Sequence, residues 1–251
     1  MQTKSFIILS SFFIFLMACA KPSKIDQTST GSIDPKAKSI AMSTMEAMGG
    51  QEKWDKLHYV SWTFFGNRHL VWDKLGGMVR IEIPKDTSIY LLDLQKMTGK
   101  VMRSGKVLTD ADKVKEELNK AKGMWINDSY WLFMPFKLMD NGVNLQYLRE
   151  DTTLKGSPAS VLQLTFNAVG NTPENKYEVY VEKDNLIKQW AYFKSATQTE
   201  APRIWPWDNY KSFDGLMLSS ERSDKSGPSN VKVYNKLDET VFTSFNKFSF
   251  Y

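Results

Sequence analysis

The feature that most constrains the fold is a succession of strand-length segments joined by short turns, which runs from His58 to about Leu108. Two of these segments, 58–65 and 68–75, flank Gly66-Asn67, a dipeptide that favours a two-residue hairpin. Further turn residues follow at short intervals, so these segments can pair with their sequence neighbours. The pattern therefore predicts an antiparallel meander in the first half of the chain.

The second half of the chain returns to the same pattern after an intervening helical region. Alternating apolar residues between turn signals are typical of strands with one buried face. The segments expected as strands are 143–148, 160–167, 177–182, 186–194, 210–213, 216–222 and 242–251.

Three helices are expected from their start and stop signals. The first begins with Asp34 as N-cap and ends at Gly49-Gly50. The second begins at Thr109 and ends before Gly123, and a short third one runs over 128–134. Pro135 is expected to end the third helix because proline cannot continue the backbone hydrogen bonds.

The first predicted hairpin carries apolar residues on both faces, since neighbouring residues of a strand point to opposite sides of the sheet. In this register the two faces contain Val60, Trp62, Phe64, Val71 and His69, and Tyr59, Phe65, Leu70 and Trp72. We expect helices to cover one face and the other to curve around a hydrophobic space. A sheet buried between two ordinary layers explains the pattern equally well.

Together these elements predict an α+β fold with a single curved antiparallel sheet of about ten strands, an incomplete barrel, and helices packed on its concave side. A length of 251 residues suits one domain of this kind. We expect residues 35–251 to form it. Residues 19–34 contain too few apolar side chains to support a core and are expected to form a tether.

The only cysteine, Cys19, follows the apolar run 6–16 and the basic residue Lys4, as at the end of a signal peptide. Leu16-Met17-Ala18-Cys19 resembles the lipobox of bacterial lipoproteins. The resemblance implies removal of residues 1–18 and lipid attachment at Cys19, and an uncleaved anchor helix is the alternative. We expect an outer-membrane anchor with the domain facing the periplasm.

The chain carries no sequence signature of catalysis, of a metal site or of a cofactor site, so we expect a protein that is not an enzyme. In the predicted hairpin His58 and His69 are roughly 20 Å apart and cannot share a metal ion. Carboxylates on predicted strands are expected to face solvent: Glu82, Asp93, Glu178 and Glu182. Basic and acidic residues are mixed along the chain, which argues against nucleic acid as a partner.

Two segments resemble a group of uncharacterised Bacteroidota lipoproteins whose fold is thought to be similar to the lipoprotein carriers LolA and LolB. They are residues 47–64, with Gly49-Gly50 and Trp54, and residues 130–143, with Tyr130-Trp-Leu-Phe-Met and Asp140-Asn-Gly-Val143. The resemblance implies a curved sheet plugged by helices, with acyl chains bound between them. No functional residue of the carriers matches a motif here.

The high aromatic content, 13% of the chain, favours a cavity for a hydrophobic small molecule or lipid. The densest apolar cluster, 130–136, is expected to be either a buried plug or a mobile lid. The residues expected to line the cavity are Trp62, Phe64, Trp72, Trp131, Phe133, Phe136 and Trp190.

Two alternatives to lipid binding remain open at this point. Trp205 and Trp207, in a predicted loop at 204–210, could bind a glycan or could fold back over one end of the sheet. A purely structural or interaction protein would instead fill its cavity with its own side chains. We expect a monomer, and the sequence specifies no protein partner.

Overall fold

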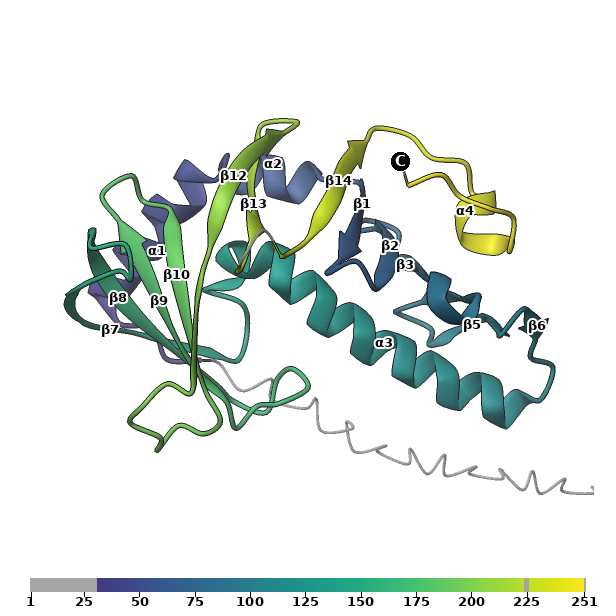
Figure 1. The fold of residues 1–251 in the computed structure, drawn as a ribbon, viewed down its shortest axis with the longest axis horizontal. Helices are drawn as coiled ribbons and strands as arrows, with labels where there is room; N and C mark the ends of the chain where they lie inside the picture. Colours follow the sequence, from purple (N-terminus) through teal and green to yellow (C-terminus); the bar gives the residue numbers. More distant parts are fainter. Residues whose placement is uncertain (1–30, 224–225, 251) are drawn as a thin grey trace, which may run out of the picture.

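The computed structural model describes residues 31–223 and 226–250, so the predicted signal peptide and Cys19 lie outside the described residues. The described chain is an α+β protein with antiparallel sheets of seven, five and two strands and few helices (Figure 1). The predicted fold class is confirmed in this form. The strands do not form a single sheet, and the large sheet is not closed into a barrel.

The seven-stranded sheet confirms the predicted meander. Its order is β14-β1-β2-β3-β4-β5-β6, so six consecutive strands lie side by side and a late strand adds to one edge. The strands are β1 (Tyr59–Phe64), β2 (Arg68–Asp73), β3 (Met78–Ile83), β4 (Ser88–Asp93), β5 (Thr98–Arg103), β6 (Lys106–Val107) and β14 (Ser229–Tyr234). A short 3-10 turn, η1 (Pro84–Asp86), connects β3 to β4.

The register predicted for the first hairpin is wrong by one residue. The turn contains three residues, 65–67, and it places Phe65 and Gly66 at φ values of 45° and 71°. Trp62 therefore pairs with Leu70, and Val60 pairs with Trp72. A shift of one residue moves every side chain of a strand to the other face, so Trp72 shares a face with Trp62.

The helical region in the middle of the chain is one helix, α3 (Ala111–Phe133), rather than the two predicted helices. Asp110, not Thr109, caps it, and its carboxylate accepts from the Lys113 backbone N–H at 3.0 Å. Asp128, expected to start a new helix, instead accepts two hydrogen bonds from Arg68 on β2, at 2.6 and 2.7 Å. This tertiary contact keeps the helix continuous past Gly123.

The remaining helices are short apart from α1 (Pro35–Ala47), which begins as predicted with the Asp34 side chain bound to the Ala37 N–H at 2.9 Å. An unpredicted helix, α2 (Gln51–Lys56), follows it. A 3-10 segment, η2 (Met134–Lys137), continues α3 across Pro135. The predicted strand 242–251 is wrong, because this region holds α4 (Thr240–Thr243) and then irregular chain to residue 250.

The five-stranded sheet has the order β11-β10-β9-β8-β7, and β12 and β13 form the small third sheet. The strands of the five-stranded sheet are β7 (Val143–Thr152), β8 (Pro158–Phe166), β9 (Lys176–Glu182), β10 (Ile187–Phe193) and β11 (Arg203–Pro206). The small sheet consists of β12 (Asp208–Phe213) and β13 (Leu216–Glu221).

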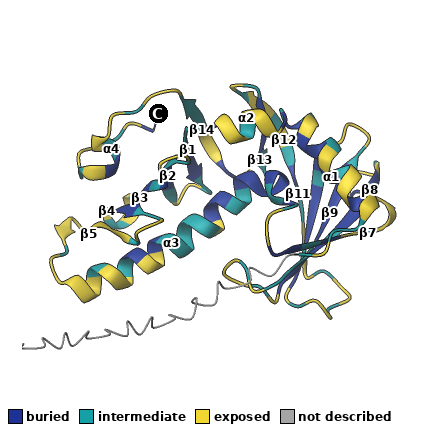
Figure 2. Cartoon of the chain, turned by 180° about the vertical axis from the view of Figure 1, so that it is seen from behind, coloured by how far each residue is buried: buried dark blue, intermediate teal, exposed yellow. Residues whose placement is uncertain are grey.

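Helix α3 connects the two main cores. It lies along β3, β4 and β5 and reaches β13 at its C-terminal end (Figure 1). It is largely exposed where it begins and buried where it ends (Figure 2). Leu132 and Phe133 belong to the core under the seven-stranded sheet, whereas Tyr130 and Trp131 pack on the core of the five-stranded sheet. The end of α3 is therefore the junction between the cores.

The stability of the seven-stranded sheet should depend on pH through His69. This side chain on β2 is buried, and its Nδ1 lies 2.8 Å from Thr63 Oγ1. Burial lowers the pKa of His69, and the negative charge of Glu82 opposes this effect only in part. The unfolded chain therefore binds a proton more readily, with an ordinary pKa near 6.5. Stability should be constant above about pH 6.5 and fall as the pH is lowered toward the folded-state pKa.

In the His69→Gln variant, most of this decrease in the free energy of unfolding should be absent. Urea unfolding between pH 5 and 8 measures it. The matched control is His58→Gln, since the His58 side chain is 37% exposed. If both substitutions changed the pH dependence of the free energy of unfolding equally, the decrease would not arise from burial of His69.

Candidate functional site

A cleft of about 940 Å³ lies beside the C-terminal half of α3. Side chains from α3, from the five-stranded sheet and from the loops after β8 form most of its wall, and Trp54 and Trp72 extend it toward the seven-stranded sheet. Its aromatic lining consists of Trp54, Trp72, Trp125, Tyr130, Trp131, Phe133, Phe166, Tyr177, Trp190, Tyr192, Trp205 and Trp207.

The structure brings four of the seven predicted lining residues to this cleft: Trp72, Trp131, Phe133 and Trp190. The other three, Trp62, Phe64 and Phe136, lie outside its lining. Trp62 is completely buried, with its ring centroid 5.7 Å from that of Phe133, and Phe136 stacks on Trp54 at 4.7 Å. Trp62 and Phe136 belong to the core under the seven-stranded sheet, and the partly buried Phe64 packs against that core.

One stripe of the lining runs along β10 and β11. Trp190, Tyr192 and Lys194 follow at every second residue, as do Arg203, Trp205 and Trp207, so each set lies on one face. The antiparallel register places Trp190 opposite Trp205 and Tyr192 opposite Arg203. The predicted loop at 204–210 is therefore wrong, because this segment holds the end of β11 and the start of β12.

Sequence reasoning missed Tyr177, Tyr192 and Trp205 as part of this wall. The period of two at 190, 192 and 194 indicates that these residues share a face, but the sequence predicts a loop where their partner strand lies. Pairing of β10 with β11 stacks Trp205 on Trp190 at 5.2 Å with an angle of 7° between the rings. Trp131 then approaches Trp190 and Trp205 from α3 at 5.0 and 5.2 Å.

Several lining residues carry buried hydrogen-bond donors. Five such donors have no hydrogen-bond partner within the described part of the chain: the Nε1 atoms of Trp72, Trp125, Trp190 and Trp207, and the Tyr130 hydroxyl. Burial raises the pKa of Tyr130 well above its ordinary value, and of Tyr177 to a smaller extent. Both phenols are therefore protonated at neutral pH and can donate.

A buried arginine fixes the inner end of this wall. Arg222 is 1% exposed, and its Nη2 donates to the Trp131 carbonyl oxygen at 2.5 Å, in the last turn of α3. Its Cζ lies 3.4 Å from the Trp207 ring centroid. Burial lowers the pKa of Arg222 to about 9, so the guanidinium is still charged at neutral pH. A cation at this position also interacts favourably with the negative, C-terminal end of the helix dipole.

The charged residues of the lining are mostly basic: Lys137, Lys194 and Arg203, with Asp140 as the acid. Lys137 and Asp140 pair with each other at 2.5 Å. Lys194 and Arg203 are exposed, and neither has a described carboxylate within ion-pair distance. The cleft therefore has an excess of positive charge at these two residues.

Within residues 31–223 and 226–250, no three histidine, cysteine, aspartate or glutamate side chains are grouped as a metal site. None of the described helices has the length and apolar character needed to cross a membrane. The arrangement at the cleft is suited to binding, since aromatic rings offer apolar surface.

No family model and no curated protein matches the sequence. Among solved structures, the chain is similar to the crystal structure of a DUF1329 family protein from Desulfovibrio piger, with 12% sequence identity and a TM-score of 0.41. The likeness covers 83% of this chain and 97% of that chain. At this distance it provides no argument about function, which must be inferred from the cleft.

Proposed function

We propose that this protein binds a hydrophobic ligand, a lipid or an acyl chain, in the cleft beside α3. It does so as a periplasmic lipoprotein held at the outer membrane by a lipid on Cys19. The observation that carries the proposal is the cleft itself. Its volume of about 940 Å³ lies near the upper end of the range for ligand pockets, roughly 300–1,000 Å³.

The aromatic wall supports an apolar occupant. Each CH₂ group moved from water to such a wall contributes about 0.8 kcal/mol, so a long chain gains affinity from continuous contact. A purely structural protein would pack the same aromatics at crystal-like density and leave no space of this size. In the carriers LolA and LolB the chain lies between sheet and helices, and we propose the same arrangement here.

The buried state of Trp207 argues against the glycan alternative. A sugar platform needs an accessible ring face, but Trp207 is 1% exposed and Arg222 covers one of its faces. Trp205 is stacked on Trp190, which occupies one of its faces as well. Lipid binding remains the better proposal because an acyl chain needs only the part of the aromatic lining that is accessible from the cleft, not a free face of these two rings.

Replacing Trp131 by alanine should weaken binding of a fluorescent fatty-acid probe at least tenfold, about 1.4 kcal/mol. The substitution removes the ring that contacts Trp190 and Trp205, while the Trp131 carbonyl that binds Arg222 remains. Probe titration of residues 19–251, prepared without the lipid, measures the change. Phe248→Ala is the control, because this ring contacts Tyr234 and Phe250, away from the cleft. Absence of saturable binding by the unmodified chain would refute the proposal.

A further inference from the structure

We propose that the ligand of the cleft is an anionic amphiphile, with its apolar chain at the tryptophan end and its negatively charged head group at Lys194 and Arg203. This inference rests on the proposed function and adds the chemical class and the orientation of the ligand. The argument follows one stripe of residues across the wall, from its buried end to its exposed end.

The inner end of the stripe is aromatic and excluded from water. Trp207 and Trp190 are 1% and 4% exposed, and the partly buried Trp131 packs against them from α3 and adds to the apolar lining at this end. A charged group placed here would lose its hydration, which is strongly unfavourable without a partner. The nearest buried cation, Arg222, already binds the Trp131 carbonyl and Ser219. The inner end therefore suits the apolar part of a ligand.

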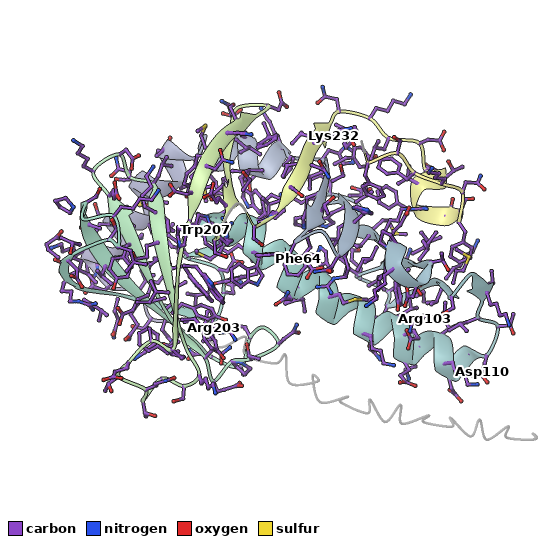
Figure 3. All side chains as sticks on the ribbon, in the orientation of Figure 1. Phe64, Arg103, Asp110, Arg203, Trp207 and Lys232 are labelled. Atoms are coloured by element: carbon purple, nitrogen blue, oxygen red, sulfur yellow. The ribbon has the colours of Figure 1, made fainter. Side chains whose placement is uncertain are left out.

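The outer end of the same stripe is basic. Lys194 follows Trp190 and Tyr192 on one face, and Arg203 precedes Trp205 and pairs with Tyr192. Four residues of extended strand separate Trp190 from Lys194, roughly 13 Å. Figure 3 shows the same order along β11 and the residue that follows it, with Trp207 near the end of α3 and Arg203 toward the loops.

Both cations are available for a ligand. Among the described residues, no carboxylate pairs with Lys194 or Arg203, and the acid of the lining, Asp140, pairs with Lys137. An arginine fork binds carboxylate or phosphate oxygens with two parallel hydrogen bonds, and charged hydrogen bonds of this kind are about twice as strong as neutral ones. A neutral head group would gain neither contact.

The Tyr130 hydroxyl and the Trp190 Nε1 group are buried and have no acceptor among the described residues. Both atoms lie beneath the surface of the cleft, so they do not contribute to the choice of ligand. An apolar inner end and an unpaired basic outer end together fit an anionic amphiphile.

The test compares three photoreactive probes of equal chain length: a fatty acid, the corresponding fatty alcohol and the corresponding alkyl phosphate. Each is crosslinked to the full-length lipidated protein in neutral vesicles, and the labelled residues are identified by mass spectrometry. We expect saturable labelling of the cleft by the anionic probes, reduced at least about fivefold in the double variant Lys194→Gln/Arg203→Gln. Labelling by the alcohol should be the same in both proteins. The stronger anionic probe then assigns the head group as carboxylate or phosphate.

The control is Lys211→Gln/Lys236→Gln, which removes the same charge from exposed positions outside the lining and should leave all labelling unchanged. If acid and alcohol label the cleft equally, and the double variant changes neither, the inference is wrong while the proposed function stands. If no probe labels the cleft saturably, the proposed function itself fails.

Discussion

Replacing Arg80 by leucine is expected to lower the free energy of unfolding by about 3–5 kcal/mol, the scale on which a buried ion pair responds to loss of one partner. Arg80 lies on β3 with no exposed surface. Its Nε donates to Glu82 at 2.6 Å, and Nη1 and Nη2 donate to three carbonyl oxygens of residues 241–246 at 2.7–2.9 Å. Leucine would leave these acceptors and the Glu82 charge without a partner.

The variant should also release the C-terminal segment from the sheet, because Arg80 supplies hydrogen bonds to its main chain. Urea unfolding measures the loss of stability, and hydrogen exchange around residues 241–246 measures the release. Lys100→Met is the matched control, since Lys100 also donates to this segment, at the Thr243 carbonyl, but from an exposed position. It should change stability by less than about 1 kcal/mol. Equal losses in the two variants would contradict the role assigned to Arg80.

Replacing Cys19 by serine is expected to abolish lipid attachment completely. The expectation comes from the sequence, because the acceptor is the thiol of the single cysteine that ends the lipobox-like tetrapeptide 16–19. A serine hydroxyl is a far weaker nucleophile than a thiolate, so the precursor should accumulate without lipid and without cleavage. Labelling with a radioactive fatty acid, followed by gel electrophoresis, measures both effects.

The control for this prediction is Ser23→Ala, which changes a neighbouring residue of the tether and should leave labelling intact. Labelling that persists in the Cys19→Ser chain would contradict the lipoprotein assignment and with it the proposed membrane location. It would leave the proposal for the cleft untouched, because the cleft is formed entirely by residues 54–207.

Local sequence signals predicted the parts of the fold that depend on local physics. The Asp34-Pro35 start of α1 and the meander from β1 to β6 are confirmed, since caps and short turns are set by adjacent residues. The errors occur where distant contacts decide the structure. Arg68 holds Asp128 inside α3, and Arg80 binds the carbonyls of the C-terminal segment in place of a strand partner.

The candidate site shows the same difference between features set by local residues and features set by distant contacts. Trp131, Phe133, Trp190 and Trp72 were identified from the density and alternation of aromatics, and all four line the cleft. Nothing in the local sequence separates them from Trp62, which is equally apolar but lies at the centre of the core. The pairing of β10 with β11, which completes the wall, could not be predicted because the nine residues between these strands, 194–202, give no register.

The most direct test of the central claim is native mass spectrometry of the lipidated protein isolated from its own membrane. We expect a second species, heavier by the mass of one anionic lipid or fatty acid, which is depleted in the Trp131→Ala variant and retained in Phe248→Ala. A spectrum that contains only the ligand-free protein, before and after incubation with a fatty acid, would contradict the account of the cleft as a binding site.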